Sequence, residues 1–210
     1  MMFLSPDQLW GFLLAAVVLT LTPGPDNLMV LSLGMSKGRR LGMAFGLGCA
    51  LGCVSHTLLA ALGVGALIAA SPTAFGLLKV AGALYLFYMA WNAWQSRGVT
   101  SLPDSNAAAA RAMPWFFKGL LANAINPKVV VFFLALLPQF VQAERGMAAG
   151  QMLELGLWFT LQAAVLFVSL GWFAGHIGAW LSRRPHAGVW LDRLAALVMA
   201  GLGWRLLLSE

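Results

Sequence analysis

Charged residues are scarce in this chain of 210 residues, because Asp, Glu, Lys and Arg together make up only 10% of it. Soluble domains carry about 25% charged residues. Hydrophobic residues account for 60% of the chain, and its mean hydropathy is +0.82. Such a composition cannot cover a folded surface with polar side chains, which excludes an ordinary soluble protein. We therefore expect an integral membrane protein surrounded by the lipid bilayer.

Cysteine is also scarce, and its two copies, Cys49 and Cys53, lie four residues apart on one apolar segment. This spacing is poor geometry for a disulfide and matches no zinc motif. The sequence contains no metal-ligand cluster and no nucleophile–base motif, so we expect no metal, no cofactor and no enzymatic activity. An intramembrane enzyme that uses Asp26 and His56 as acid and base is one alternative.

Short alternating segments, which are typical of membrane β-strands, are absent as well. The chain instead contains six apolar stretches of about 20 residues or more, the length of a membrane-spanning helix. The expected fold class is therefore all-α, with spans near 8–34, 41–69, 74–95, 114–140, 149–177 and 188–208.

Positive charge is concentrated in alternate connections between these spans. The second connection, 70–73, has no charged residue. The first, third and fifth connections carry or are flanked by Lys37, Arg39, Arg40, Arg97, Arg111, Lys118, Arg183, Arg184 and Arg193. Because cytoplasmic connections are enriched in Lys and Arg, we expect these three in the cytoplasm and both termini outside it. The net charge of +6 then reports orientation and indicates no nucleic-acid partner.

Six spans divide into two halves of three, approximately 1–96 and 112–210, and an odd number of spans inverts the second half relative to the first. Inverted repeats of this kind occur in many secondary transporters. The polar stretch between the halves, approximately 97–111, is predicted to be a cytoplasmic linker. Residues 1–210 are therefore expected to form a single transmembrane transporter domain.

Glycine organises the second span, where Gly42, Gly46, Gly48 and Gly52 precede His56 at helical spacing. Small residues at such spacing let helix backbones approach closely within a membrane. We expect a helix-packing face here. Its partner is either another helix of the same chain or a second copy in a homodimer.

Proline interrupts the first and the fourth spans at corresponding points. The first contains Thr22-Pro23-Gly24-Pro25-Asp26-Asn27 and the fourth contains Asn126-Pro127-Lys128, so that Pro25 and Pro127 lie 127 − 25 = 102 positions apart. Broken helices in equivalent places of two halves indicate a transporter's binding site near the membrane midplane, although a lone proline only kinks a helix. The predicted substrate-binding residues are Pro23, Gly24, Pro25, Asp26, Asn27, Asn123, Asn126, Pro127 and Lys128.

Each break is predicted to restart a helix. Gly24 and Asn126 suit the N-cap position, and Pro25 and Pro127 suit the first helical position after them. The N-termini of restarted helices expose N–H groups and favour anions.

Asp26 and Lys128 place two opposite charges beside these breaks. A lone charge at the centre of a membrane helix costs about 2.5–3.5 kcal/mol on the insertion scale. We therefore expect the two residues either to pair with each other or to bind a zwitterion, with its ammonium at Asp26 and its carboxylate at Lys128. Asp26 is the first candidate for a proton carrier and His56 the second. Whether His56, Gln162 and Glu154 line the cavity is left open by the sequence.

Across roughly residues 5–145, the chain resembles the LysE/RhtB family of bacterial amino-acid exporters. The resemblance rests on Thr22–Asn27, Lys37–Gly42, the glycines before His56, Lys79–Leu86 and Asn126–Lys128. It implies a secondary transporter in the bacterial inner membrane that exports amino acids or close derivatives and is driven by the proton motive force. It does not select one amino acid. A channel or a lipid-handling membrane protein is the second alternative.

Overall fold

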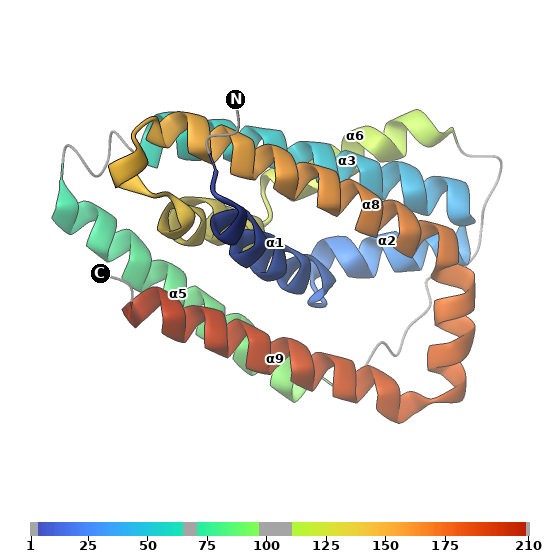
Figure 1. Ribbon diagram of the computed structural model, residues 1–210. Helices are drawn as coiled ribbons and strands as arrows, with labels where there is room; N and C mark the ends of the chain where they lie inside the picture. Colours follow the sequence, from blue (N-terminus) through green and yellow to red (C-terminus); the bar gives the residue numbers. More distant parts are fainter. Residues whose placement is uncertain (1–3, 65–70, 97–110, 209–210) are drawn as a thin grey trace.

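The computed structural model describes residues 4–64, 71–96 and 111–208, and most of them lie in helices (Figure 1). The helices are α1 (Pro6–Leu21), α2 (Pro25–Ser36), α3 (Arg39–Leu59), α5 (Pro72–Gln95), α6 (Ala112–Ala124), α7 (Pro127–Val131), α8 (Ala148–Arg183) and α9 (Pro185–Leu208). The chain is π-helical over Ala60–Val64 and Phe132–Leu136 and forms 3-10 turns over Leu137–Phe140 and Ala143–Arg145. These ranges contain no strand, which agrees with the all-α class. The predicted linker lies outside the described residues except for Arg111.

The first and the fourth predicted spans are both bent at their proline motifs. α1 meets α2 at 55°, and α6 meets the segment Pro127–Phe140 at 49°. Gly24 is the N-cap of α2, and Asn126 is the N-cap of α7, where its side chain accepts a hydrogen bond from the Lys128 N–H at 3.0 Å. The predicted caps are therefore confirmed. We call residues 22–24 the first break and residues 125–126 the second break.

Three described helical segments are long and apolar enough to cross a membrane: Arg39–Gly63, Thr73–Gln95 and Ala148–Arg183. Each bent pair adds one more if it counts as a single span, which gives up to five. The sixth predicted span, 188–208, corresponds to α9, in which three charged residues lower the hydropathy. Its crossing of the membrane stays a prediction.

The helices form a bundle with a separate pair along one side. α3 packs against α2, α6 and α8, whereas α5 packs mainly against α9. In Figure 1, α5 and α9 run along the lower edge, and the C-terminal part of α8 turns down toward the start of α9. The rings of Phe12, Phe132 and Phe159 meet with centroids 5.1–6.4 Å apart, which holds α1 beside α8 and the segment after α7.

The glycines of the second span pack against other helices of the same chain. A Cβ on Gly48 would collide with the Phe116 carbonyl oxygen of α6, and one on Gly119 would collide with the Phe45 carbonyl oxygen of α3. A Cβ on Gly42 would lie 2.9 Å from a Cα of α2. Because these glycines serve contacts within the chain, a homodimer would have to use another surface.

The end of α2, the start of α6 and the end of α8, which flank the first, third and fifth connections, lie on the right side of the bundle in Figure 1. Lys37 and Lys118 are 5.0 and 4.3 Å from the centroid of the same ring, that of Trp115. The Arg193 guanidinium in the first half of α9 lies 5.5 Å from the Trp94 centroid at the end of α5. These cation–π contacts join the end of α2 to α6 and the end of α5 to α9.

Candidate functional site

Lys128 follows the second break, and its side chain extends to the end of α1 beside the first break. It is the second residue of α7, is only 4% exposed, and its Nζ donates to the carbonyl oxygens of Leu19 (3.1 Å) and Thr22 (2.8 Å). These carbonyls lie at the C-terminal end of α1, where acceptors lack partners within the helix and positive charge is favourable. Gly24 makes room for the lysine, because a Cβ there would lie 3.0 Å from Nζ. Lys128 therefore caps the end of α1.

Other side chains complete the hydrogen bonding of this helix end. Asn27 Nδ2 donates to the Thr20 carbonyl at 2.7 Å, and the Thr22 N–H and hydroxyl donate to the Val18 carbonyl at 3.0 and 2.7 Å. Gln162 of α8 donates to the Thr20 hydroxyl at 2.9 Å. Backbone groups in a membrane must be satisfied within the protein, and these contacts let α1 end inside the bundle.

Asn123, which precedes the second break, contacts Asp26, which follows the first break. It lies in the last turn of α6, and its Nδ2 donates to Asp26 Oδ2 at 2.8 Å. Asp26 is 3% exposed and lies in the first turn of α2, where negative charge is favourable. Within the described residues, the Asp26 carboxylate and the Lys128 ammonium form no ion pair with each other. Neutral groups bind both charged side chains, so the direct pairing that was one of the two expected arrangements is absent, and binding of a zwitterion stays a prediction.

His56 and Cys53 of α3 contact the same asparagine. His56 Nε2 lies 3.0 Å from the Asn123 carbonyl oxygen, and the imidazole centroid is 5.7 Å from that of Phe133. Because a carbonyl only accepts, Nε2 carries the proton in this contact. The Cys53 thiol donates to Asn123 Oδ1 at 3.5 Å, and neither cysteine forms a disulfide. We call Asp26, His56, Asn123 and Lys128 the break cluster.

A pocket of about 140 Å³ adjoins the first break. It lies among α2, α8 and α9, and Leu21, Pro23, Asn27, Ile177 and Asp192 are among the residues that line it. We call it the first-break pocket. Two predicted site residues thus line this pocket, whereas no member of the break cluster is among its described lining residues.

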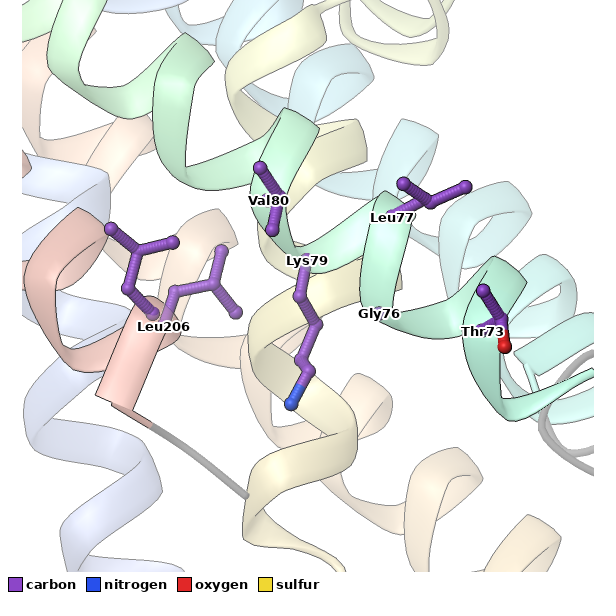
Figure 2. Close-up of a pocket in the computed structure, with 7 residues that line it drawn as sticks. Thr73, Gly76, Leu77, Lys79, Val80 and Leu206 are labelled. Atoms are coloured by element: carbon purple, nitrogen blue, oxygen red, sulfur yellow. The ribbon is translucent and has the colours of Figure 1, made fainter.

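Two further pockets are not lined by residues 22–24 or 125–126. Figure 2 shows one of about 400 Å³ between the N-terminal part of α5 and the end of α9, lined by Thr73, Lys79 and Leu206 among others. The second, of about 530 Å³, is a largely apolar groove between α1 and α8 that Gln162 lines. Glu154 is half-buried and lines none of the three pockets.

Two polar atoms at the breaks have no hydrogen-bond partner in the described part of the chain. They are Asn27 Oδ1 and Asn126 Nδ2, and both are buried. Each amide uses its other end, since Asn27 Nδ2 bonds the end of α1 and Asn126 Oδ1 caps α7. Buried polar atoms without partners are uncommon, so these two mark places where a ligand or water can add hydrogen bonds.

A second polar cluster, which the sequence analysis missed, lies at the opposite end of α1. Gln8 Nε2 donates to the Phe140 carbonyl and to Gln151 Oε1, the latter at 2.7 Å. Gln151 also accepts from the Gln142 N–H at 3.0 Å and donates to its carbonyl at 2.9 Å. These bonds tie the starts of α1 and α8 together. The sequence feature that could have predicted this cluster is the position of Gln8 and Gln151 at the starts of two apolar segments.

The sequence matches the profile of LysE type translocators over residues 17–210. It is similar to an uncharacterized membrane protein of Vibrio cholerae, with 33% identity covering 92% of this chain and 93% of that protein. It is also similar to the homoserine/homoserine lactone efflux protein of Salmonella typhimurium, with 30% identity covering 82% of each chain. The threonine efflux protein of Escherichia coli is 27% identical over 92% of this chain and 94% of its own length. No solved structure matches the chain.

Proposed function

Because the chain belongs to the family of LysE type translocators, we propose that it is a secondary transporter that exports amino acids or close derivatives from the cytoplasm. Relatives with efflux names for homoserine and threonine cover most of the chain, which supports this substrate class. The proposed energy source is the proton motive force. The observation that supports the mechanism is a set of hydrogen bonds between the two breaks. Lys128 donates to carbonyls at the end of α1, and Asn123 donates to Asp26.

The proposed architecture is one transporter domain of six spans, arranged as an inverted repeat of residues 1–96 and 112–210 joined by a cytoplasmic linker. The bends at corresponding points of the first and fourth spans support the repeat. The ends of α2 and α8 and the start of α6, which lie on one side of the bundle in Figure 1, support a common side for connections one, three and five. In the bacterial inner membrane, that side would be the cytoplasm and both termini would lie outside.

The break cluster is the proposed centre of substrate binding. Pro23, Gly24, Pro25, Asn27, Asn126 and Pro127 form its backbone frame. In the conformation described here, Lys128 binds backbone carbonyls and Asp26 binds an amide. We propose that substrate replaces these neutral partners, with its carboxylate at Lys128 and its ammonium at Asp26.

Partner exchange gives the substrate a physical means of shifting the conformation. A hydrogen bond between two opposite charges adds Coulomb attraction to the charge-assisted bond that either charge already makes with a neutral group. A zwitterion therefore favours the state in which Lys128 and Asp26 have left the opposite break, while the neutral partners favour the closed state without substrate. A ligand shifts an equilibrium only through such a difference in affinity. Rocking of the two halves around the breaks would then expose the cluster to each side in turn.

Asp26 is the proposed coupling residue, with His56 as the second candidate. A proton that reaches Asp26 from outside would neutralise its carboxylate and weaken its hold on the substrate ammonium. Protonation of Asp26 from outside would then promote release of the substrate to the outside, so that one residue would couple the two movements. His56 of α3 contacts the backbone carbonyl of Asn123 at 3.0 Å, and the Asn123 side chain contacts Asp26. A movement of Asn123 on protonation of Asp26 would therefore affect His56 and α3.

Counterflow in proteoliposomes tests this function. Purified protein would be reconstituted, loaded with one unlabelled amino acid at a time, and supplied with the labelled form outside, with and without an imposed pH gradient. We expect saturable counterflow for at least one amino acid and acceleration by the gradient. Unsaturable flux would indicate a channel, and turnover of a lipid or peptide without counterflow would indicate an enzyme that uses Asp26 and His56. Either result would overturn the proposal.

A further inference from the structure

Asp192 of α9 is a buried carboxylate that the break cluster does not use. It is 9% exposed, it lines the first-break pocket, and its Oδ2 is enclosed without a hydrogen-bond partner in the described residues. The guanidinium of the next residue, Arg193, instead lies over the rings of Trp94 and Trp190, at 5.5 and 5.6 Å. Burial of a carboxylate oxygen without a partner is unfavourable, which indicates a partner other than the described residues.

A second unpartnered acceptor lines the same pocket. Asn27 is 7% exposed, and its Nδ2 donates to the Thr20 carbonyl at 2.7 Å. This bond assigns the amide orientation and leaves Oδ1 as an acceptor, which has no partner within the described ranges. Two acceptors, one of them charged, match a positively charged group that only donates hydrogen bonds. An ammonium group has three donors and no acceptor.

The rest of the pocket selects an aliphatic ligand of small size. Leu31 of α2 and Leu170 and Ile177 of α8 are among its lining residues, and none of the described residues that line it is basic. Its volume of about 140 Å³ is below the roughly 300–1,000 Å³ of pockets for drug-sized ligands. A small molecule with an aliphatic side chain and an ammonium group fits these properties, whereas an acidic side chain would be repelled by the Asp192 carboxylate.

The position of the pocket relates it to the break cluster. Pro23 lines the pocket, and the adjacent Gly24 lies against Lys128. Ile177 and Asp192 flank the fifth connection, which is one of the basic connections. By the charge rule these connections face the cytoplasm, the side from which an exporter takes its substrate.

Resting on the proposed function, we infer that the first-break pocket is a loading site for amino acids with aliphatic side chains, in which Asp192 binds the substrate ammonium before the substrate reaches the break cluster. Asn27 Oδ1 supplies the second acceptor. The site thus narrows the substrate class from amino acids in general to those whose side chain is apolar.

Ligand-dependent thermal stability of the purified protein tests this site without requiring transport. The melting temperature would be followed against the concentration of leucine, of isopentylamine, which keeps the ammonium and the chain, and of N-acetyl-leucine, which lacks the ammonium. The variant is Asp192→Asn, which keeps the size of the side chain. The matched control is Glu144→Gln, which neutralises an exposed carboxylate in the turn Ala143–Arg145.

We expect leucine and isopentylamine to stabilise the wild type, since a ligand that binds the folded state raises its stability, and N-acetyl-leucine to have no effect. Asp192→Asn should raise the half-saturating concentration of both amines about tenfold or more, the size expected for loss of a charge-assisted hydrogen bond. Glu144→Gln should leave it unchanged.

Stabilisation of the wild type by N-acetyl-leucine as strong as that by leucine, or none by isopentylamine, would overturn the loading site even if Asp192→Asn does not fold. Unchanged affinities in a folded Asp192→Asn would also overturn it. Transport separates the two proposals. If the wild type shows counterflow and Asp192→Asn does not change the half-saturating substrate concentration, the protein is an exporter but the loading-site proposal is wrong. If ligands bind through Asp192 but no counterflow occurs, the pocket binds amines but the exporter proposal is wrong.

Discussion

Replacement of Lys128 by methionine separates the folding role of this residue from its transport role. Methionine keeps an unbranched side chain of similar length but removes the charge and the three donors. The substitution deletes the hydrogen bonds from Nζ to the carbonyls of Leu19 and Thr22. It also removes a charge from a position that is only 4% exposed. The two effects on stability therefore have opposite signs.

Their magnitudes nearly cancel. Side-chain hydrogen bonds in membrane proteins contribute about 0.6 kcal/mol on average and about 1.7 kcal/mol at most, so two of them contribute about 1.2–3.4 kcal/mol. Removal of a charge from the centre of a membrane helix returns about 2.5–3.5 kcal/mol. The net change then lies between about 2 kcal/mol more stable and about 1 kcal/mol less stable. Lys128→Met should therefore fold, yet it should lose transport, because the substrate carboxylate has no cation to bind.

The measurements are the melting temperature in detergent and counterflow in proteoliposomes. Lys118→Met is the matched control, since Lys118 is exposed on α6 and lies 4.3 Å from the Trp115 ring centroid. We expect both variants to fold and only Lys128→Met to lose counterflow, by at least about a hundredfold, or about 2.7 kcal/mol. Wild-type counterflow by Lys128→Met would refute the substrate role, and its failure to fold would refute the calculated balance.

Three further substitutions test other parts of the structure. Asp26→Asn keeps an acceptor for Asn123 Nδ2, so the protein should fold, but counterflow should require a higher substrate concentration and export should no longer be accelerated by a pH gradient; gradient-driven export at the wild-type level would exclude Asp26 as the coupling residue. Gly48→Ala should lower stability by about 1–3 kcal/mol, because its Cβ meets the Phe116 carbonyl. Gly175→Ala on α8 is its control, with no atom within 4 Å of the added Cβ; equal melting temperatures for the two would contradict the packing argument. Gln151→Leu removes a buried amide from the cluster at the start of α8 and should cost about 1–3 kcal/mol, measured by chemical or thermal unfolding.

The breaks could be predicted from the sequence because their causes are local. Pro25 and Pro127 lack backbone donors, and Gly24 and Asn126 suit the caps that precede them. Both restarts therefore follow from neighbouring residues, and the structure has them at the predicted positions. The apolar helices followed from hydropathy in the same way. The location of the basic connections on one side of the membrane stays a prediction.

The partners of the charged residues could not be predicted in this way. Lys128 lies 109 and 106 residues from the two residues whose carbonyls it binds, and Asn123 lies 97 residues from Asp26. The sequence suggested direct pairing of the two charges as one possibility and did not reveal the backbone carbonyls that a broken helix end offers to Lys128. Binding of a ligand to the two charges stays a prediction. The contact between Gln8 and Gln151, which are 143 residues apart, could not be predicted either.

By itself, the sequence determined a helical membrane protein with two proline breaks and an acid and a base beside them, since composition and local backbone chemistry suffice for these features. Only the tertiary structure decided that neutral groups of the opposite break hold each charge and that Asp192 lines a pocket with an unpartnered oxygen. Hydrogen-bond partners and burial depend on distances in space, which helix packing sets and which the order of residues along the chain does not reveal.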